Sequence, residues 1–241
     1  MATFKSQGIV IKSLKYRESS LIVDIYSREK GLRSYIVNGV RKAKSRMSPS
    51  LFQHGTIVDM IAYDSNPGRL SRIKEISLSY HYNHLPFEIG KSSIALFLLE
   101  LIQTTIKESE QNFPLYEFLE GWLKFIDVYE GSLSLPHIKF MAEYPSYLGF
   151  KPMNNQSDEK PYFHLEYGYF VHDYERIDQV LNKEVSHALR TIFLTKKEDL
   201  PMLHIPKHDR ELLINGLLSF YKWHIDDFRD LKSYDILKQL F

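Results

Sequence analysis

The first eighty residues alternate between apolar and polar positions over short segments, which are separated by turn-forming residues. Ile, Val and Tyr recur in five segments, at 8–16, 20–27, 32–39, 56–64 and 70–80. Period-two alternation in residues that favour extended backbone predicts β-strands. The sequence "REKG" at 28–31 predicts a hairpin turn, and "SNPG" at 65–68 predicts a second turn. We therefore expect five short strands in this part of the chain.

After Pro86 the pattern changes, because apolar residues now recur at helical spacing. The first such segment ends near Lys107, and a second helix is predicted at 112–129, with Asn112 as its N-cap. Further helices are predicted at 134–147, 177–193 and 210–228. Pro145 should bend or end the first of these early, and Asp209 is the expected N-cap of the last.

Residues 151–175 interrupt the helical pattern. Their first part, "KPMNNQSDEKP", is polar and rich in turn-forming residues, and "YFHLEYGYFVHDY" alternates like a hairpin that turns at Tyr167-Gly168. Five strands followed by helices predict an α+β protein. We expect a five-stranded β-barrel of the OB-fold class at 1–80, which commonly binds oligonucleotides, and a mainly α-helical domain at 81–241 with a small β-hairpin insertion.

Composition excludes several classes of protein. The chain contains no cysteine, so disulfides, thiolate catalysis and cysteine-ligated metal sites are absent. The most apolar run, "IALFLLELI" at 94–102, is much shorter than the roughly 20 residues that a membrane-spanning helix needs, and we expect no membrane association. The sequence "MATFKSQGIVIKS" lacks the apolar core of a signal peptide, so a cytoplasmic location is expected.

Charge is distributed unevenly along the chain. Residues 1–80 contain fourteen Lys and Arg against six Asp and Glu, a balance of +8, whereas 81–241 contain seventeen against twenty-four, a balance of −7. The sequence "NGVRKAKSRMS" at 38–48 carries Arg41, Lys42, Lys44 and Arg46. No acidic residue lies between Glu29 and Asp59. Clustered charge of one sign predicts an anionic partner for the first part of the chain.

Nucleic acid is the anionic partner that this pattern favours. Proteins that bind single strands combine a cationic groove for phosphates with aromatic faces on which bases stack. Arg41, Lys42, Lys44 and Arg46 supply the cations, Ser45 a neutral donor, and Lys30 and Arg33 extend the patch. Tyr35, Phe52 and Tyr63 are candidate stacking residues, although for each of them a place in a hydrophobic core is the favoured interpretation. A solvated turn or a site for an acidic protein are the alternatives for the basic segment.

The sequence contains no convincing set of catalytic or metal-binding residues. The pairs His81-x-x-His84 and His204-x-x-x-His208 have the spacing of metal ligands, but no third ligand accompanies either pair. The chain contains no G-x-x-x-x-G-K-[ST] segment to hold a nucleoside triphosphate and no G-x-S-x-G segment. We therefore expect no enzymatic activity, no cofactor and no metal site. A metal-dependent nuclease and an RNA-binding module remain open as alternatives.

The N-terminal sequence resembles the beginning of the RecO family of bacterial recombination mediators and DNA repair proteins. The resemblance rests on Tyr16-Arg17-Glu18-Ser19-Ser20, on Ser27-Arg28-Glu29-Lys30-Gly31, and on the Gly-Val-Arg-Lys-x-Lys-Ser-Arg segment at 39–46. It is specific over about eighty residues and continues more faintly to the Leu-Lys-Ser segment at 231–233.

The resemblance implies an OB-fold followed by a helical domain. It also implies binding of single- and double-stranded DNA, annealing of complementary strands and, together with RecR, loading of RecA onto DNA coated by single-stranded-DNA-binding protein. Such a role would place the protein with the nucleoid. In this family the helical domain is thought to bind the acidic tail of the single-strand-binding protein, for which Arg190, Lys196 and Lys197 are the candidate partners here.

The chain departs from the family at one point. Many RecO proteins carry a four-cysteine zinc module where this chain has residues 151–175, and here every cysteine is missing. The resemblance therefore implies a degenerate, metal-free insertion. We expect its aromatic and aliphatic side chains to pack in place of the metal, namely Tyr162, Phe163, Leu165, Tyr167, Tyr169 and Phe170.

Overall fold

The computed structural model describes residues 2–40, 47–66, 68–106 and 110–241. The chain forms two compact units, Met1–Val128 and Tyr129–Phe241. The first unit contains the predicted barrel and also the first two helices. The strands and these helices thus belong to the same compact unit. The domain boundary that we expect after residue 80 stays a prediction.

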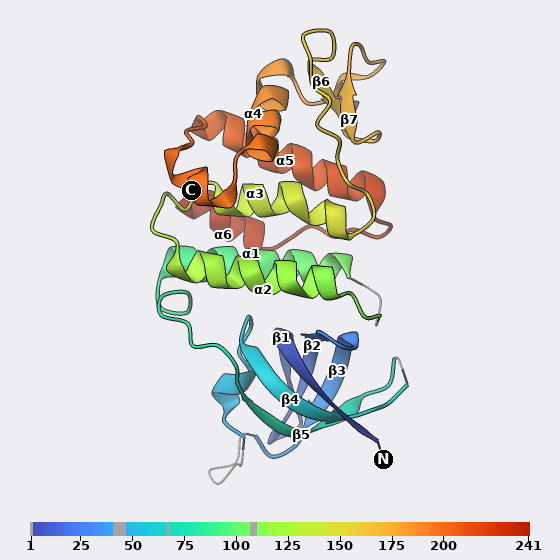
Figure 1. Ribbon diagram of the computed structural model, residues 1–241, viewed down its shortest axis with the longest axis vertical. Helices are drawn as coiled ribbons and strands as arrows, with labels where there is room; N and C mark the ends of the chain where they lie inside the picture. The colour runs from blue at the N-terminus through green and yellow to red at the C-terminus, as the bar shows by residue number, and fades with distance from the viewer. Residues whose placement is uncertain (1, 41–46, 67, 107–109) are drawn as a thin grey trace. The chain divides into compact units, whose positions relative to one another are not determined.

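Five strands close into a barrel in the order β1-β2-β3-β5-β4 (Figure 1). They are β1 (Thr3–Tyr16), β2 (Ser20–Ser27), β3 (Gly31–Val37), β4 (Ile57–Tyr63) and β5 (Ser71–Leu78). The predicted α+β class and five-stranded OB-fold barrel are thus confirmed. Strand β1 pairs with both β2 and β4, and its register with β2 shifts between Val10 and Lys12. Such a bulge bends a strand, which helps one long strand to pair with a neighbour on each side in a closed barrel.

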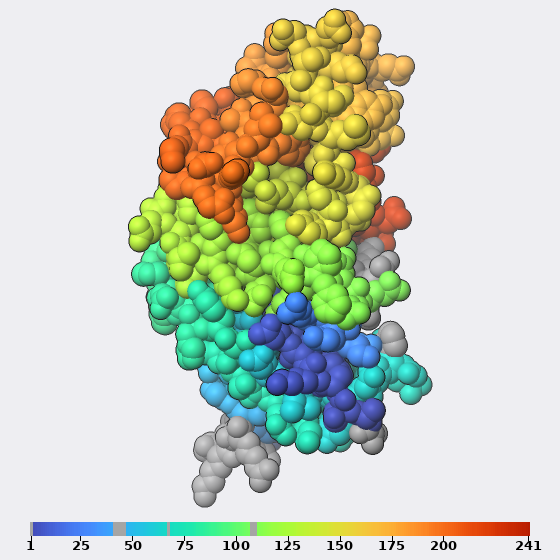
Figure 2. Space-filling model, in the orientation of Figure 1, coloured from blue at the N-terminus to red at the C-terminus, as the bar shows by residue number. Residues whose placement is uncertain are grey.

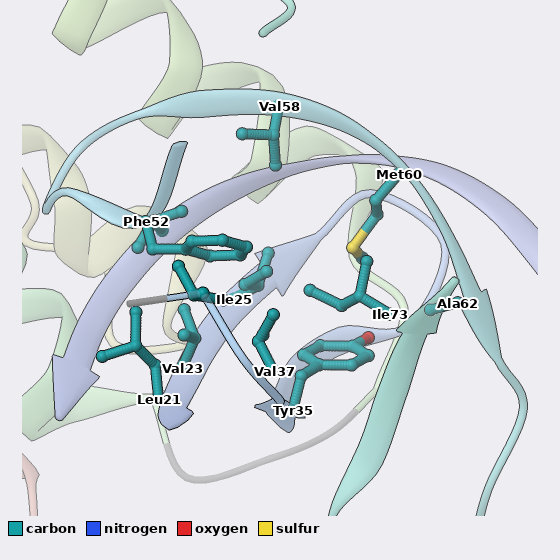
Figure 3. Packing of buried hydrophobic residues seen from close by; sticks show 12 residues of the cluster. Leu21, Val23, Ile25, Tyr35, Val37, Phe52, Val58, Met60, Ala62 and Ile73 are labelled. Carbon is teal, nitrogen blue, oxygen red and sulfur yellow. The ribbon is translucent and has the colours of Figure 1, made fainter. Parts of the chain in front are cut away.

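The barrel core consists of the inward-facing residues of each strand. Alternate residues in the middle of β2 and at the end of β3 are buried in this core, namely Val23 and Ile25, and Tyr35 and Val37 (Figure 3). Phe52, in the 3₁₀ helix Pro49–Phe52 between β3 and β4, packs into the same cluster. Since side chains alternate along a strand, the residues between the buried ones face away from the core.

Two helices complete the first unit, α1 (Ile89–Thr105) and α2 (Phe113–Val128). The predicted N-cap of α2 is confirmed, because Leu115 N–H donates to Asn112 Oδ1 at 3.0 Å. At the other end of α2, the fully buried carboxylate of Asp127 accepts hydrogen bonds from three consecutive backbone N–H groups. These belong to Asn83, His84 and Leu85, at 3.0, 2.8 and 2.7 Å. This contact fixes the segment after β5 against α2.

The second unit is mainly helical. Its helices are α3 (Pro136–Glu143), α4 (Lys183–Leu194), α5 (Lys207–His224) and α6 (Ser233–Leu240), and 3₁₀ turns include Tyr144–Tyr147 and Ile177–Gln179. The buried ammonium of Lys139 on α3 donates to the carbonyl of Ile192 on α4 at 2.8 Å. Tyr221 on α5 donates to the carbonyl of Met141 at 3.0 Å. Among the described helices, none is both long and apolar enough to span a bilayer.

Two helix starts differ from the prediction. The helix predicted from residue 177 begins at Lys183, because Asn182 caps it by accepting from Val185 N–H at 2.8 Å. The predicted N-cap Asp209 is wrong, since α5 begins at Lys207 after Pro206. Asp209 lies in the first turn, where a carboxylate is favoured by the helix dipole rather than by capping.

The insertion forms the predicted hairpin, β6 (Tyr162–His164) and β7 (Tyr169–Val171), and lies at the surface of the second unit (Figures 1 and 2). Phe163, Leu165 and Phe170 are buried, which agrees with the predicted packing of these three side chains. Tyr167 and Tyr169, by contrast, are exposed, and the Tyr167 ring stacks on His164 with 3.8 Å between ring centroids. The hairpin is tied to α4, because Phe163 N–H donates to Ser186 Oγ at 2.9 Å.

Candidate nucleic-acid interface

The basic segment lies in the connection between β3 and β4, and its two ends are anchored in the barrel. Val40, immediately before it, is buried, and Met47, immediately after it, packs against the barrel core. The predicted phosphate-binding residues Arg41, Lys42, Lys44, Ser45 and Arg46 lie outside the described residues. The structure thus fixes the place on the barrel at which the segment begins and ends.

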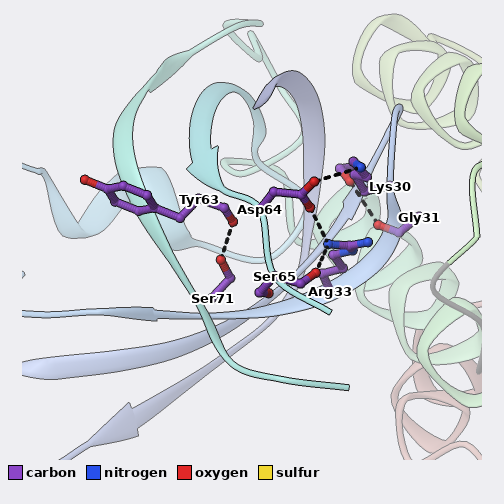
Figure 4. A network of polar contacts seen from close by, with 8 residues as sticks. Lys30, Gly31, Arg33, Tyr63, Asp64, Ser65 and Ser71 are labelled. Carbon is purple, nitrogen blue, oxygen red and sulfur yellow. Dashed lines mark hydrogen bonds and ion pairs between the residues drawn. The ribbon is translucent and has the colours of Figure 1, made fainter. Parts of the chain in front are cut away.

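Lys30 and Arg33, the other two predicted phosphate-binding residues, share a single carboxylate. Asp64, which follows β4, lies 3.3 Å from Lys30 Nζ and 3.2 Å from Arg33 Nη1 (Figure 4). Arg33 Nη1 also donates to the carbonyl of Ser65 at 2.8 Å. The hydrogen bond from Lys30, together with the charges of both cations, lowers the pKa of Asp64 despite partial desolvation. Two cations with one anion leave this cluster with a charge of +1.

The exposed fractions of the Lys30 and Arg33 side chains decide which of the two can contact a phosphate. The side chain of Lys30 is 32 % exposed and that of Asp64 39 %, whereas that of Arg33 is only 10 % exposed. Arg33 has the same orientation along β3 as the buried Tyr35, two residues later, so it faces the end of the barrel interior. Lys30 is the more accessible of the two cations.

Two of the three candidate stacking residues cannot present a ring to a ligand. Tyr35 is 0 % and Phe52 2 % exposed, and both belong to the barrel core (Figure 3). For these two residues the core role, which the sequence favours over stacking, is the correct interpretation. Tyr63 is partly exposed and pairs with Thr3, at the start of β1.

Several exposed cations of the barrel were not singled out from the sequence. Arg17 lies in the β1–β2 turn and Arg69 in the β4–β5 connection, while Arg72 and Lys74 lie on β5. In OB-folds these two connections flank the surface that binds oligonucleotides. The sequence gives a positional signal for Arg69, which directly follows the turn predicted at 65–68, and for Arg17, which lies between two predicted strands.

The second unit contains an open groove of about 990 Å³ between α4 and the segment before α5. Arg190, a predicted tail-binding residue, lines it together with Lys183, His187 and His204. Acidic side chains line it as well, namely Asp158, Glu184 and Asp209. Lys196 and Lys197 follow the end of α4 and are not part of the groove lining. The structure therefore brings only one of the three predicted residues to this groove.

The groups that could supply metal chemistry are dispersed. Across residues 2–40, 47–66, 68–106 and 110–241, no three His, Asp or Glu side chains converge closely enough to hold a metal ion. His84 Nδ1 contacts Glu88 Oε1 at 2.9 Å within the turn that precedes α1. His164 is buried, and burial lowers the pKa of its imidazole.

Comparisons with known proteins cover almost the whole chain. The family model described as "Recombination protein O N terminal" matches residues 1–82, and "Recombination protein O C terminal" matches residues 86–235. The chain is 34% identical to "DNA repair protein RecO" of Flavobacterium johnsoniae over 241 residues, with 98% of each chain covered. It is 31% identical to the protein of that name from Phocaeicola vulgatus over 237 residues, again with 98% of each chain covered.

Proposed function

The chain belongs to the RecO family of DNA repair proteins, and on this premise we propose that it holds DNA on its barrel and brings strands or partner proteins together without a covalent step. In this proposal it binds single- and double-stranded DNA and anneals complementary strands. With RecR it helps to load RecA onto DNA that is coated by single-stranded-DNA-binding protein. It acts as a mediator and not as an enzyme.

One observation carries the proposal. A closed barrel of the OB-fold class has four cations in a six-residue stretch of one connection, within an N-terminal part that has a balance of +8. Binding to phosphates releases the counterions condensed on the nucleic acid, so a dense cation cluster favours a polyanion over a single small anion. The lack of an acidic residue between Glu29 and Asp59 leaves these cations without a local partner in sequence.

The helical unit is proposed to bind the acidic tail of the single-strand-binding protein. Support comes from the open groove beside α4, whose apolar lining includes Ala188, Leu203 and Ile205. Arg190 could pair with a carboxylate at its rim. The acidic residues of the same groove would limit the strength of such binding, because like charges repel. Lys196 and Lys197 would act, if at all, outside the groove.

Fluorescence anisotropy with a labelled single-stranded oligonucleotide tests the proposal. We expect binding that weakens steeply as salt is raised, with unlabelled DNA competing better than RNA of the same sequence. A second assay mixes two complementary labelled strands and follows their energy transfer, and we expect the protein to accelerate annealing. Binding that is absent, or that is insensitive to salt, would contradict the proposal.

Replacing Asp64 with asparagine is expected to strengthen DNA binding. The substitution removes the carboxylate that Lys30 and Arg33 share, so Lys30 becomes available to phosphate. We expect affinity to rise about threefold at low salt, and the slope of log K against log salt to steepen by about 0.7 for one further phosphate contact. Anisotropy titrations at several salt concentrations measure both quantities.

Asp230→Asn provides a matched control. It makes the same change in net charge and also frees a lysine, because Asp230 pairs with Lys222 at 2.8 Å in the helical unit. We expect this variant to bind DNA as the wild type does. If the two variants gain affinity equally, the effect reflects net charge, and Lys30 has no special place in binding.

A further inference from the structure

The helical unit contains a second open groove, of about 700 Å³, between α5 and the segment that joins the hairpin to α4. All the residues that line it belong to the second unit and lie between Tyr162 and Ser219. It shares only Lys183 and Glu184, in the first turn of α4, with the groove that contains Arg190. The two grooves are therefore separate surfaces that meet at the start of α4.

The floor of this second groove is apolar and already formed. Leu212, Gly216 and Ser219 line it, and their spacing of four and three residues places them on one face of α5. Gly216 has no side chain, and Leu181 packs directly against it, so that a Cβ at this position would collide with the leucine. The face of α5 that lines the groove is two helical turns, or roughly 10 Å, long.

Large apolar side chains are exposed at the rim of this groove. Ile177 is 79% exposed and Tyr174 38%, and both belong to the lining. Two polar side chains of the lining, by contrast, are engaged within the chain. Asn182 caps α4, and Asn215 Oδ1 accepts from the hydroxyl of Tyr234 at 3.0 Å. The groove thus presents apolar surface to solvent, which favours a partner that buries apolar side chains in it.

The charges around the groove are mainly negative. Residues 173–184 contain four carboxylates and two cations, and 211–219 contain one further carboxylate and no cation, which gives a balance of −3. All seven charged residues are exposed. The guanidinium of Arg176 is already bound by both carboxylate oxygens of Asp178, at 3.1 and 2.6 Å. Such a rim repels an acidic segment and attracts a basic one.

We propose that this groove binds an amphipathic helix of a partner protein, with apolar residues on one face and Lys or Arg along its edges. Helices dock in apolar grooves through anchors at i, i+3 or i+4, and i+7, and two turns of such a helix match the length of the α5 face. Ile177 packs against the apolar anchors, and the surrounding carboxylates attract the cations. This partner is opposite in charge to the acidic tail proposed for the groove beside Arg190, and its binding does not require DNA.

Fluorescence anisotropy of the full chain with a labelled peptide of leucine and lysine tests this proposal. The peptide has about 15 residues, the length at which an isolated helix begins to be stable, and its leucines have the spacing of one helical face. We expect it to bind more tightly than a peptide in which glutamate replaces every lysine. It should also bind more tightly than a peptide of the same composition whose scrambled order leaves no apolar face.

Ile177→Ala should weaken binding of the leucine–lysine peptide about tenfold, because three carbon atoms of the rim no longer pack against the peptide. The side chain is largely exposed, so its loss should leave the fold intact. Met202→Ala is the matched control, since it shortens a side chain that is 84% exposed and lies outside the groove lining. We expect this variant to bind the peptide as the wild type does.

Asp178→Asn tests the contribution of charge. It removes a carboxylate from the rim and releases Arg176, so we expect the leucine–lysine peptide to bind about threefold more weakly at low salt. Asp230→Asn makes the same change in net charge and releases Lys222 outside the groove lining, and it should have no effect. Equal losses in the two variants would overturn the proposed match of charge between groove and partner.

Three further results would overturn the proposal. The first is equal binding of the leucine–lysine peptide by wild type and Ile177→Ala, and the second is tighter binding of the glutamate peptide. The third is self-association of the wild type in sedimentation velocity that Ile177→Ala abolishes, because the groove would then be an interface between two copies of this chain. DNA binding is measured separately with oligonucleotides, so each of these results would leave the proposed function of the barrel intact.

Discussion

Replacing Arg41, Lys42, Lys44 and Arg46 together by alanine should remove most of the salt dependence of DNA binding. If the four side chains contact phosphates of a single strand, the wild-type slope of log K against log salt is about −0.7 × 4, or about −3. Affinity then falls about 50-fold between roughly 50 and 200 mM salt in the wild type, and hardly at all in the variant. Salt titrations of anisotropy measure this change directly.

The control for this variant removes the same number of charges elsewhere. Four exposed lysines of the helical unit can be replaced by alanine together, namely Lys151, Lys160, Lys207 and Lys238. We expect their loss to leave the slope near its wild-type value. Circular dichroism should show that the loop variant remains folded, because the substituted residues lie between anchors that it leaves intact, Val40 and Met47. A folded loop variant with an unchanged slope would exclude the segment as the phosphate-binding element.

Much of the barrel can be predicted from the sequence because β-favouring apolar residues recur at every second position over parts of its strands. β2 and β3 are examples, in which apolar residues occupy the alternate inward positions Leu21, Val23 and Ile25, and Tyr35 and Val37. The start of β1 is missed, since "TFKSQ" at 3–7 is mostly polar and reads as a loop. This segment forms a strand because β4 supplies its hydrogen bonds from some sixty residues away. Pairing over such a distance leaves no local signal.

The site is less predictable than the fold, because it depends on contacts between distant residues. Cation density at 41–46 is visible in the sequence, but the sharing of Asp64 by Lys30 and Arg33 joins the start of β3 to the residue that follows β4. The stacking candidates were chosen by residue type, and two proved to be core residues. The strand alternation would have identified Tyr35 as a core residue, since it shares the inward orientation of Val37 two positions later in β3. The position of a residue in the inward–outward alternation of a strand therefore indicates stacking candidates better than residue type alone.

Substituting Asp127 by alanine should destabilise the first unit by about 3 kcal/mol or more, the largest stability effect that we expect. The carboxylate is the acceptor for three consecutive N–H groups, and a buried donor left without a partner costs about 1–3 kcal/mol. Asp127→Asn keeps one acceptor oxygen and should cost less. Val128→Ala, at the neighbouring position, which is 56% exposed, should have little effect. Urea unfolding measures the global change.

Hydrogen exchange and the pH dependence of stability then test whether loss of the Asp127 carboxylate causes the destabilisation. The amides of Asn83, His84 and Leu85 should lose protection in the alanine variant, with little change in the strands of the barrel. Burial alone would raise the pKa of Asp127, but the N–H groups outweigh it and the pKa is lowered below 3.8. Above that pH the stabilisation is complete, and it is lost as the pH falls further, through the pKa of the folded state. The stability difference between wild type and alanine variant should therefore be constant at neutral pH and shrink in acid. A difference that is unaffected by acid would mean that the charge of Asp127 contributes nothing to this contact.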